Sequence, residues 1–140
     1  MELTLTEALR KGVEAHKAGK AEEADRYYTA ILKAQPKHPD ANHNMGVLAV
    51  GIGKVKEALP FFKTASEANP KIAQYWLSYI DALIKLDRIE EAKSVFDQAK
   101  SNGLQGDGFD ELKQRLGGIE KGKGVDATSI MAKEPPRKQV

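Results

Sequence analysis

The side chains that could carry out chemistry are few and scattered along this chain of 140 residues. Its histidines are His16, His38 and His43, and a zinc site would need at least two of them to converge with a carboxylate. His38 lies in a turn between two prolines, whereas His16 and His43 are expected at opposite ends of neighbouring helices. We therefore expect ordinary surface histidines and no metal site.

Other catalytic signals are equally weak. No serine lies in a G-x-S-x-G elbow. The stretch 51–54, Gly-Ile-Gly-Lys, resembles part of a phosphate-binding loop, but it follows a predicted helix and lacks the upstream glycine of a Walker sequence. Glu23, Glu57 and Glu91 open predicted helices, where the helix dipole favours a carboxylate. The sequence thus predicts no enzymatic activity, no catalytic residue and no cofactor.

A constant repeat spacing is the strongest signal in the chain. A basic residue, a Glu-Ala pair and an aromatic residue recur at Lys20/Glu23/Ala24/Tyr28, Lys54/Glu57/Ala58/Phe62 and Arg88/Glu91/Ala92/Phe96. Five residues before each alanine lies Gly19, Gly53 or Asp87, which suits a tight turn at the end of a helix. Each repeat therefore predicts a helix, a short turn and a second helix.

Further positions keep the same spacing and indicate how the helices pack. Twelve residues before each alanine lies Gly12, Gly46 or Ile80, and twelve after it lies Pro36, Pro70 or Leu104. Small residues allow two helices to approach closely, and Tyr28, Phe62 and Phe96 are expected to supply the area that holds each hairpin together.

This pattern resembles the tetratricopeptide repeat, a helical hairpin with a period of about 34 residues. The middle copy fits it best, through Asn42, Met45, Gly46, Ala49, Ala58, Phe62, Ala65 and Pro70. The resemblance covers residues 5 to 104 and implies an all-α fold, with repeats at about 5–38, 39–72 and 73–106 in a right-handed solenoid. Lys11, Ile80 and Leu104 depart from the pattern, as terminal repeats often do.

The local sequence predicts where the helices begin and end. Thr4 and Glu7 form a capping box for the first helix, and Asp40 is the expected N-cap of the third. Trp76 is expected at the junction between the second and third repeats. A short helix over 108–116, with Phe109, Leu112 and Leu116 on one face, would cap the last repeat. We expect a repeat domain over 1–116 and a disordered tail or linker over 117–140.

Charge and composition exclude several classes of partner. The net charge of +2 belongs to residues 117–140, whereas residues 1–116 hold 17 basic and 17 acidic side chains. A nucleic-acid-binding surface would need a basic stripe, and a membrane span would need about 18 consecutive apolar residues. The sequence shows neither, and it has no cysteine and no secretory signal pattern. We expect a cytoplasmic protein that binds neither nucleic acid nor membranes.

The resemblance also implies a binding surface. In tetratricopeptide arrays, the first helix of each hairpin lines a concave groove that receives a peptide. Carried over position by position, the predicted groove residues are Leu9, Val13, His16, His43, Asn44, Val47, Val50, Gln74, Leu77, Asp81 and Ile84, with Thr6, Asp40 and Ser78 beside them. Val13, Val47 and Leu77 are equally well explained by packing between repeats.

One subset of the family binds the acidic C-termini of heat-shock chaperones through a clamp of two lysines, two asparagines and an arginine. The matching positions here hold Leu9, Val13, Asn44, Gln74 and Ser78, so only Asn44 agrees. Without cations, a terminal carboxylate would be desolvated without a partner. The sequence predicts that this chain does not bind chaperone tails.

These observations favour a non-enzymatic module that binds a mainly apolar peptide or helix of another protein. Two alternatives stay open. Residues 34–46 are similar to repeats found in front of the catalytic domains of bacterial modular glycosyltransferases, so the chain could be the recruiting segment of a larger transferase. An apolar groove and exposed repeat ends would also suit self-association.

Overall fold

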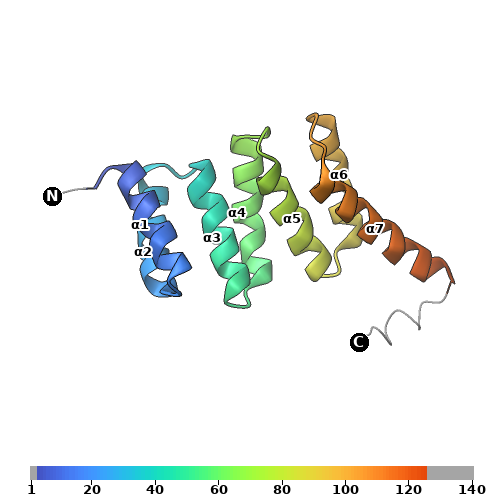
Figure 1. Cartoon of the computed structure of the whole chain (residues 1–140), viewed down its shortest axis with the longest axis horizontal. Coiled ribbons are helices and arrows are strands. Elements are labelled where there is room, and N and C mark those ends of the chain that lie inside the picture. Colours follow the sequence, from blue (N-terminus) through green and yellow to red (C-terminus); the bar gives the residue numbers. More distant parts are fainter. Residues whose placement is uncertain (1–2, 126–140) are drawn as a thin grey trace. The chain divides into compact units, whose positions relative to one another are not determined.

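The computed structural model describes residues 3–125, and all regular structure in this part of the chain is helical. Six helices form three hairpins: α1 (Leu5–Lys17) with α2 (Ala21–Ala34), α3 (Pro39–Gly51) with α4 (Val55–Ala68), and α5 (Ala73–Lys85) with α6 (Ile89–Ser101) (Figure 1). These hairpins belong to a first compact unit, Met1–Leu104. The last helix, α7 (Asp107–Val125), belongs to a second unit, Gln105–Val140.

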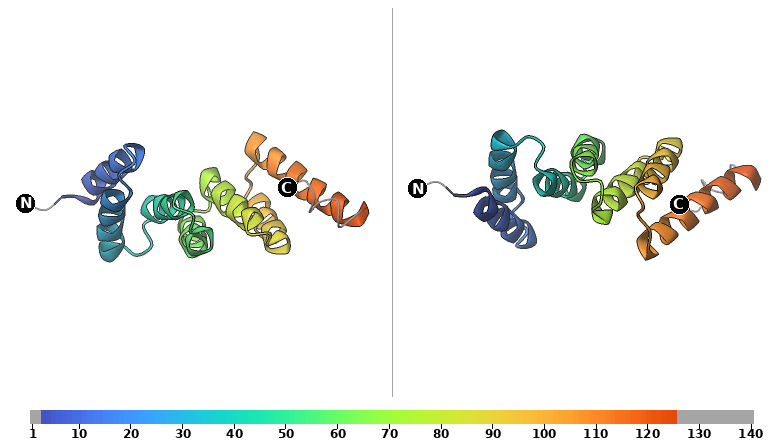
Figure 2. Two further views of the ribbon diagram at one scale, coloured as in Figure 1. Left: turned by 90° about the horizontal axis from the view of Figure 1, so that it is seen from below. Right: turned by 90° about the horizontal axis from the view of Figure 1, so that it is seen from above.

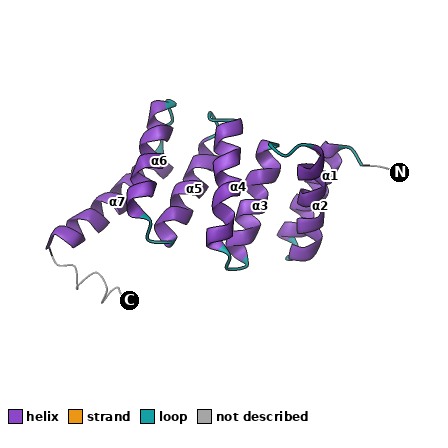
Figure 3. Cartoon of the chain, turned by 180° about the vertical axis from the view of Figure 1, so that it is seen from behind, coloured by secondary structure: helices purple, strands orange, loops and turns teal. Residues whose placement is uncertain are grey.

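Within the first unit the hairpins stack in two layers. Helices α1, α3 and α5 form one layer, and α2, α4 and α6 form the other (Figure 2). Seen from behind, the hairpins follow one another in sequence order (Figure 3). The predicted all-α array of three helix-turn-helix repeats is confirmed.

Two helix starts were predicted from capping residues, and one prediction was wrong. At α1, the Thr4 hydroxyl accepts the Glu7 backbone N–H at 3.1 Å, and the Glu7 carboxylate accepts the Thr4 N–H at 3.1 Å, so the capping box is confirmed. At α3, the N-cap is His38, whose Nδ1 accepts the Ala41 N–H at 3.1 Å. Asp40 lies inside the first turn, because the preceding proline, with no N–H and a fixed φ, suits the first helical position.

The turns inside the three hairpins share one backbone conformation. Gly19, Gly53 and Asp87 have φ values of 78°, 85° and 60°. This left-handed region costs an ordinary residue about 1–2 kcal/mol, which explains the two glycines. Aspartate tolerates it better than most residues do. The prediction that these three positions end the first helix of each repeat is confirmed.

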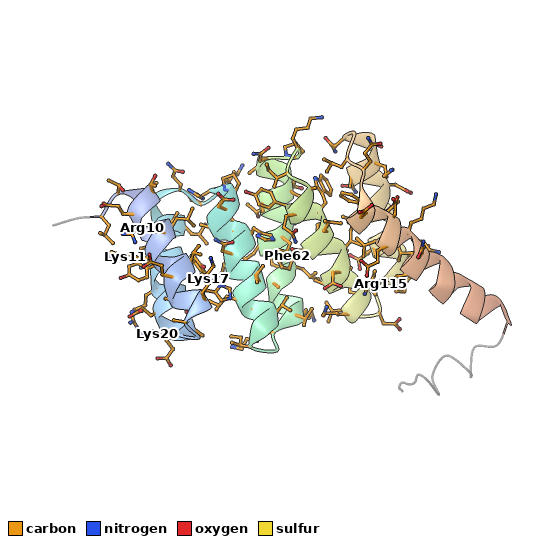
Figure 4. All side chains as sticks on the ribbon, in the orientation of Figure 1. Arg10, Lys11, Lys17, Lys20, Phe62 and Arg115 are labelled. Atoms are coloured by element: carbon orange, nitrogen blue, oxygen red, sulfur yellow. The ribbon has the colours of Figure 1, made fainter. Side chains whose placement is uncertain are left out.

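The first two hairpins are held by an aromatic ring lying against a glycine. A Cβ atom on Gly12 would lie 2.6 Å from the Tyr28 ring, and one on Gly46 would lie 2.5 Å from the Phe62 ring. Both rings are fully buried, and Phe62 is labelled at the centre of the array in Figure 4. The missing side chain lets each ring rest on the backbone of the facing helix.

The third hairpin packs differently. Ile80 occupies the glycine position and is fully buried, whereas Phe96, the aromatic residue of this repeat, is only half-buried. The prediction that Phe96 supplies the central area of its hairpin was therefore wrong in degree. Ile80 thus places a buried side chain at the position where the other two repeats leave room for an aromatic ring.

Consecutive repeats are joined by the same hydrogen bond at both junctions. The Asn42 side-chain amide donates to the Pro36 carbonyl at 3.0 Å, and the Trp76 indole N–H donates to the Pro70 carbonyl at 2.9 Å. Asn42 and Trp76 occupy equivalent positions in consecutive repeats, as do the two prolines. The prediction that Trp76 packs at this junction is confirmed, since it is buried and bonded to Pro70 in the turn between α4 and α5.

In the second unit, α7 is longer than the sequence indicated. It runs from Asp107 to Val125, whereas we expected a helix over 108–116 followed by a tail. Glycine costs a helix about 1 kcal/mol relative to alanine but does not forbid it, so Gly117 and Gly118 do not end α7. Residues 126–140 of the expected tail lie outside the described part of the chain. The capping role of α7 stays a prediction.

The glycine–aromatic contact yields a stability prediction. Gly46→Ala should lower the free energy of unfolding by about 1–3 kcal/mol, because its Cβ would overlap the Phe62 ring. Gly51→Ala is the matched control: it lies at the end of the same helix, and a Cβ added there would have no atom within 4 Å. That variant should be neutral or gain up to about 1 kcal/mol. Urea denaturation monitored by circular dichroism measures both, and equal effects would contradict the assignment.

Candidate functional site

The predicted groove residues lie on the layer made by α1, α3 and α5, whose accessible surface we call the first-helix face. Ten of the eleven are half-buried, and Gln74 is exposed. They are Leu9, Val13 and His16 on α1; His43, Asn44, Val47 and Val50 on α3; and Gln74, Leu77, Asp81 and Ile84 on α5. No member of the set is closed off from solvent, so each keeps part of its surface accessible.

Several apolar members also hold the repeats together. Val47 and Val50 pack against the buried cluster of Ala58, Phe62 and Ala82. Leu9 packs against the cores of the first repeat and its junction with the second. The expectation that inter-repeat packing shares these residues therefore holds for Val47. The first-helix face is the accessible edge of the core rather than a separate surface.

The centre of this face is more polar than the sequence suggested. His43 Nε2 lies 2.8 Å from the Ser78 hydroxyl oxygen, and the Gln74 side-chain amide donates to the same oxygen at 3.2 Å. The His43 ring also contacts Phe62 and Tyr75, with ring centroids 5.6 Å and 5.2 Å apart. Burial lowers the pKa of His43, against smaller opposing effects of its neighbours Asn44 and Asp40. Its ring therefore favours the neutral form.

A second polar contact joins α3 to α5. The Tyr75 hydroxyl donates to the Asp40 carboxylate, and burial raises the pKa of Tyr75, with further contributions from that carboxylate. Tyr75 lies 35 residues after Asp40, and Ser78 lies 35 residues after His43. Each contact therefore joins positions that are one repeat and one residue apart. Polar residues at that spacing were the sequence signal that could have revealed the two contacts.

The three histidines do not converge and are not ordinary surface residues. His16 Nδ1 lies 3.3 Å from the Tyr28 hydroxyl, and His38 caps α3. All three are half-buried and hydrogen-bonded, because each sits where two helices or a helix and a turn meet. No three histidine, aspartate or glutamate side chains gather as metal ligands within residues 3–125.

Charged side chains lie on and beside the first-helix face. Arg10 pairs with Glu14 at 2.7 Å on α1, and Lys85 pairs with Asp81 at 2.5 Å on α5. Figure 4 also labels Lys11 and Lys17 on α1 and Lys20 just before α2. The five positions that match the chaperone clamp hold Leu9, Val13, Asn44, Gln74 and Ser78, none of which is a cation.

Comparison with known families assigns this architecture. A tetratricopeptide repeat model matches residues 15–78 and 49–116. The chain belongs to the tetratricopeptide repeat family. Domains of this family are generally protein-interaction modules without catalytic activity. No curated protein sequence matches the chain.

Solved structures share the fold at low sequence identity. The Sgt2 domain from Aspergillus fumigatus superposes with a TM-score of 0.76 at 18% identity, covering 88% of this chain and 83% of that one. The TPR2B domain of yeast Sti1, in a complex with pHsp70, gives 0.72 at 20% identity, covering 81% and 95%. The first repeat domain of RPAP3, bound to the HSP90 peptide SRMEEVD, gives 0.72 at 20% identity, covering 81% and 90%.

None of the helices in residues 3–125 is long and apolar enough to cross a membrane.

The lowered pKa of His43 predicts a pH dependence of stability. As the pH falls from about 7 to about 5, the unfolded chain takes up a proton at this histidine before the folded chain does. The free energy of unfolding should therefore fall with pH. His43→Gln, which keeps an amide near Ser78, should reduce that slope. Urea titrations at a series of pH values measure it, and identical slopes in both proteins would contradict the burial of His43.

Proposed function

We propose that the first unit is a non-enzymatic module that binds a mainly apolar peptide segment or helix of another protein on its first-helix face. The observation that carries this proposal is a set of apolar side chains held half-exposed on three neighbouring helices: Leu9, Val13, Val47, Val50, Leu77 and Ile84. A peptide that covers them removes apolar area from water, worth about 25 cal/mol per Å² before the cost of association.

The polar centre of the face supports a peptide as the ligand. The Ser78 hydroxyl, held by His43 and Gln74, belongs to the same layer of first helices as these apolar side chains. A fixed hydroxyl and a side-chain amide can bond to the backbone groups of an extended or helical segment, which would orient it without requiring a charge. The neutral form of His43 suits such a ligand better than an anionic one.

The chaperone-bound neighbours share the fold with this chain, and we propose that they do not share its ligand. At the five clamp positions this chain offers two apolar side chains, two amides and a hydroxyl. A C-terminal carboxylate placed there would lose its hydration without gaining a cationic partner, which costs several kcal/mol.

This contrast gives a direct binding prediction. The HSP90 peptide SRMEEVD, which the RPAP3 domain binds in its solved complex, should show no micromolar binding to this chain by isothermal titration calorimetry. The RPAP3 domain itself is the positive control. Micromolar affinity for this chain would overturn the proposal that its ligand is apolar.

The first-helix face can be tested by a single substitution. Val47→Glu places a carboxylate at the centre of the face and should weaken partner binding at least about tenfold, equivalent to about 1.4 kcal/mol. Ala30→Glu is the matched control, because it adds the same charge at an exposed position on α2 in the other layer. Partners captured by the wild type and Ala30→Glu but lost with Val47→Glu would be ligands of this face.

The folding of each variant must be verified, since Val47 also packs against the core. Circular dichroism and a cooperative unfolding transition serve for that. Unchanged capture by a folded Val47→Glu protein would contradict the first-helix face as the binding site.

Two alternatives propose a different use for the same array. In one, the chain is the recruiting segment of a larger bacterial transferase, and reading the gene beyond Val140 decides it. In the other, the array binds its own copies, and light scattering over a range of concentrations decides it. The half-exposed apolar face supports both, because it presents the same surface to any peptide segment.

A further inference from the structure

A second apolar cleft lies at the junction of the first and second repeats, apart from the first-helix face. It has a volume of about 520 Å³ and is bordered by α2, α3 and α4. Its floor is apolar and consists of Met45, Leu48, Ala49, Ile52 and Phe61, with Ala21 beside them. None of the eleven residues predicted for the first-helix face lines it. The exposed fraction of Ile52 is 55%, unusually high for a large aliphatic side chain next to a core.

The repeat spacing explains why this cleft is open. At the next junction, Val55 and Leu59 of α4 pack against a buried cluster that includes Ala82 of α5. The equivalent residues one repeat earlier, on α2, are Ala21 and Asp25. A small side chain and a carboxylate thus replace the two aliphatic side chains that fill the equivalent space one repeat later. The α2 side of this junction therefore carries less aliphatic side-chain volume than the α4 side of the next junction.

The rim of the cleft carries mostly negative charge. Glu22 and Asp25 of α2 and Glu57 of α4 line it, against the single amine of Lys54. Asp25 accepts a hydrogen bond from Thr29, and no ion pair is formed by Glu22 or Glu57 with another side chain in the described part of the chain. An occupant with apolar side chains and adjacent cations would complement both the floor and the rim.

The dimensions of the cleft favour a helix as the occupant. Along α2 it extends from Ala21 to Thr29, and along α3 from Met45 to Ile52, the residue that caps the C-terminal end of α3. Each stretch is about two helical turns, or roughly 10–12 Å, at a rise of 1.5 Å per residue. Two turns present two or three apolar side chains along one face of a partner helix, with positions for lysine or arginine on either side.

We propose that this cleft binds an amphipathic helix from another polypeptide, with an apolar ridge that contacts Met45, Leu48 and Ile52 and basic residues that face Glu22, Asp25 and Glu57. Apolar side chains of the bound helix occupy the position that Val55 and Leu59 hold at the next junction. This binding site is separate from the first-helix face. This second surface allows one chain to hold two partners at once.

The probe for this proposal is a synthetic peptide of about four helical turns with leucine at i, i+3, i+4 and i+7 and lysine on both flanks. A second peptide has glutamate in place of every lysine. With the full chain, fluorescence anisotropy at low ionic strength should show the lysine peptide binding at least about tenfold more tightly than the glutamate peptide. Equal affinities, or no binding of the lysine peptide, would overturn the proposal.

Two substituted chains test the location. Ala21→Val with Asp25→Leu copies the filled junction and should abolish binding of the lysine peptide. Glu22→Lys with Glu57→Lys changes only exposed side chains and should reverse the preference in favour of the glutamate peptide. Because Glu22 and Glu57 are exposed, the charge-reversed protein should fold even if the filled variant does not. The location can then be tested with the charge-reversed protein alone.

The first-helix variant Val47→Glu separates this cleft from the proposed function. Peptide binding that persists in Val47→Glu and is lost in the filled variant supports the cleft. Binding lost in Val47→Glu and kept in the filled variant places the peptide on the first-helix face and overturns the proposal. Self-association that disappears in the filled variant, with no peptide binding by the wild type, would assign the cleft to a second copy of this chain and overturn it as well.

Discussion

The contact between a glycine on one helix and an aromatic ring on the next holds each of the first two hairpins together. In the first two hairpins, Gly12 and Gly46 leave no side chain between the backbone and the rings of Tyr28 and Phe62. Each ring is fully buried only because that space is empty. In these two hairpins the missing side chain lets the paired helices approach closely around a buried ring. Where Ile80 replaces the glycine, an aliphatic side chain forms the core instead.

The junctions between repeats combine one constant feature with one variable feature. The bond from Asn42 or Trp76 to the carbonyl of the preceding proline recurs at both junctions and fixes how each hairpin follows the last. The side chains beside it differ. Aliphatic residues of α4 fill the second junction, whereas Ala21 and Asp25 leave the first one open. A constant anchor lets the filling residues vary without changing the fold.

The tetratricopeptide repeat family assigns a fold and an interaction role, and the surface residues of each chain select the ligand. Neighbours at about one-fifth identity include complexes with chaperone peptides. This chain has the same helices but neutral side chains at the clamp positions, and its face is centred on a hydrogen-bonded His43–Ser78 pair. Packing positions can therefore stay the same while the chemistry offered to a ligand changes.

The sequence alone determined the number of repeats, the hairpin turns and which side chains share the first helix of each repeat, because a strict repeat period places equivalent side chains in equivalent environments. It did not determine what depends on contacts between helices, whether within one repeat or across two. The His43–Ser78 pair, the partial exposure of Phe96 and the open cleft beside Asp25 each arise from residues of different helices that meet only after folding. A repeat pattern encodes the positions that are alike, and tertiary packing decides what happens where neighbouring repeats differ.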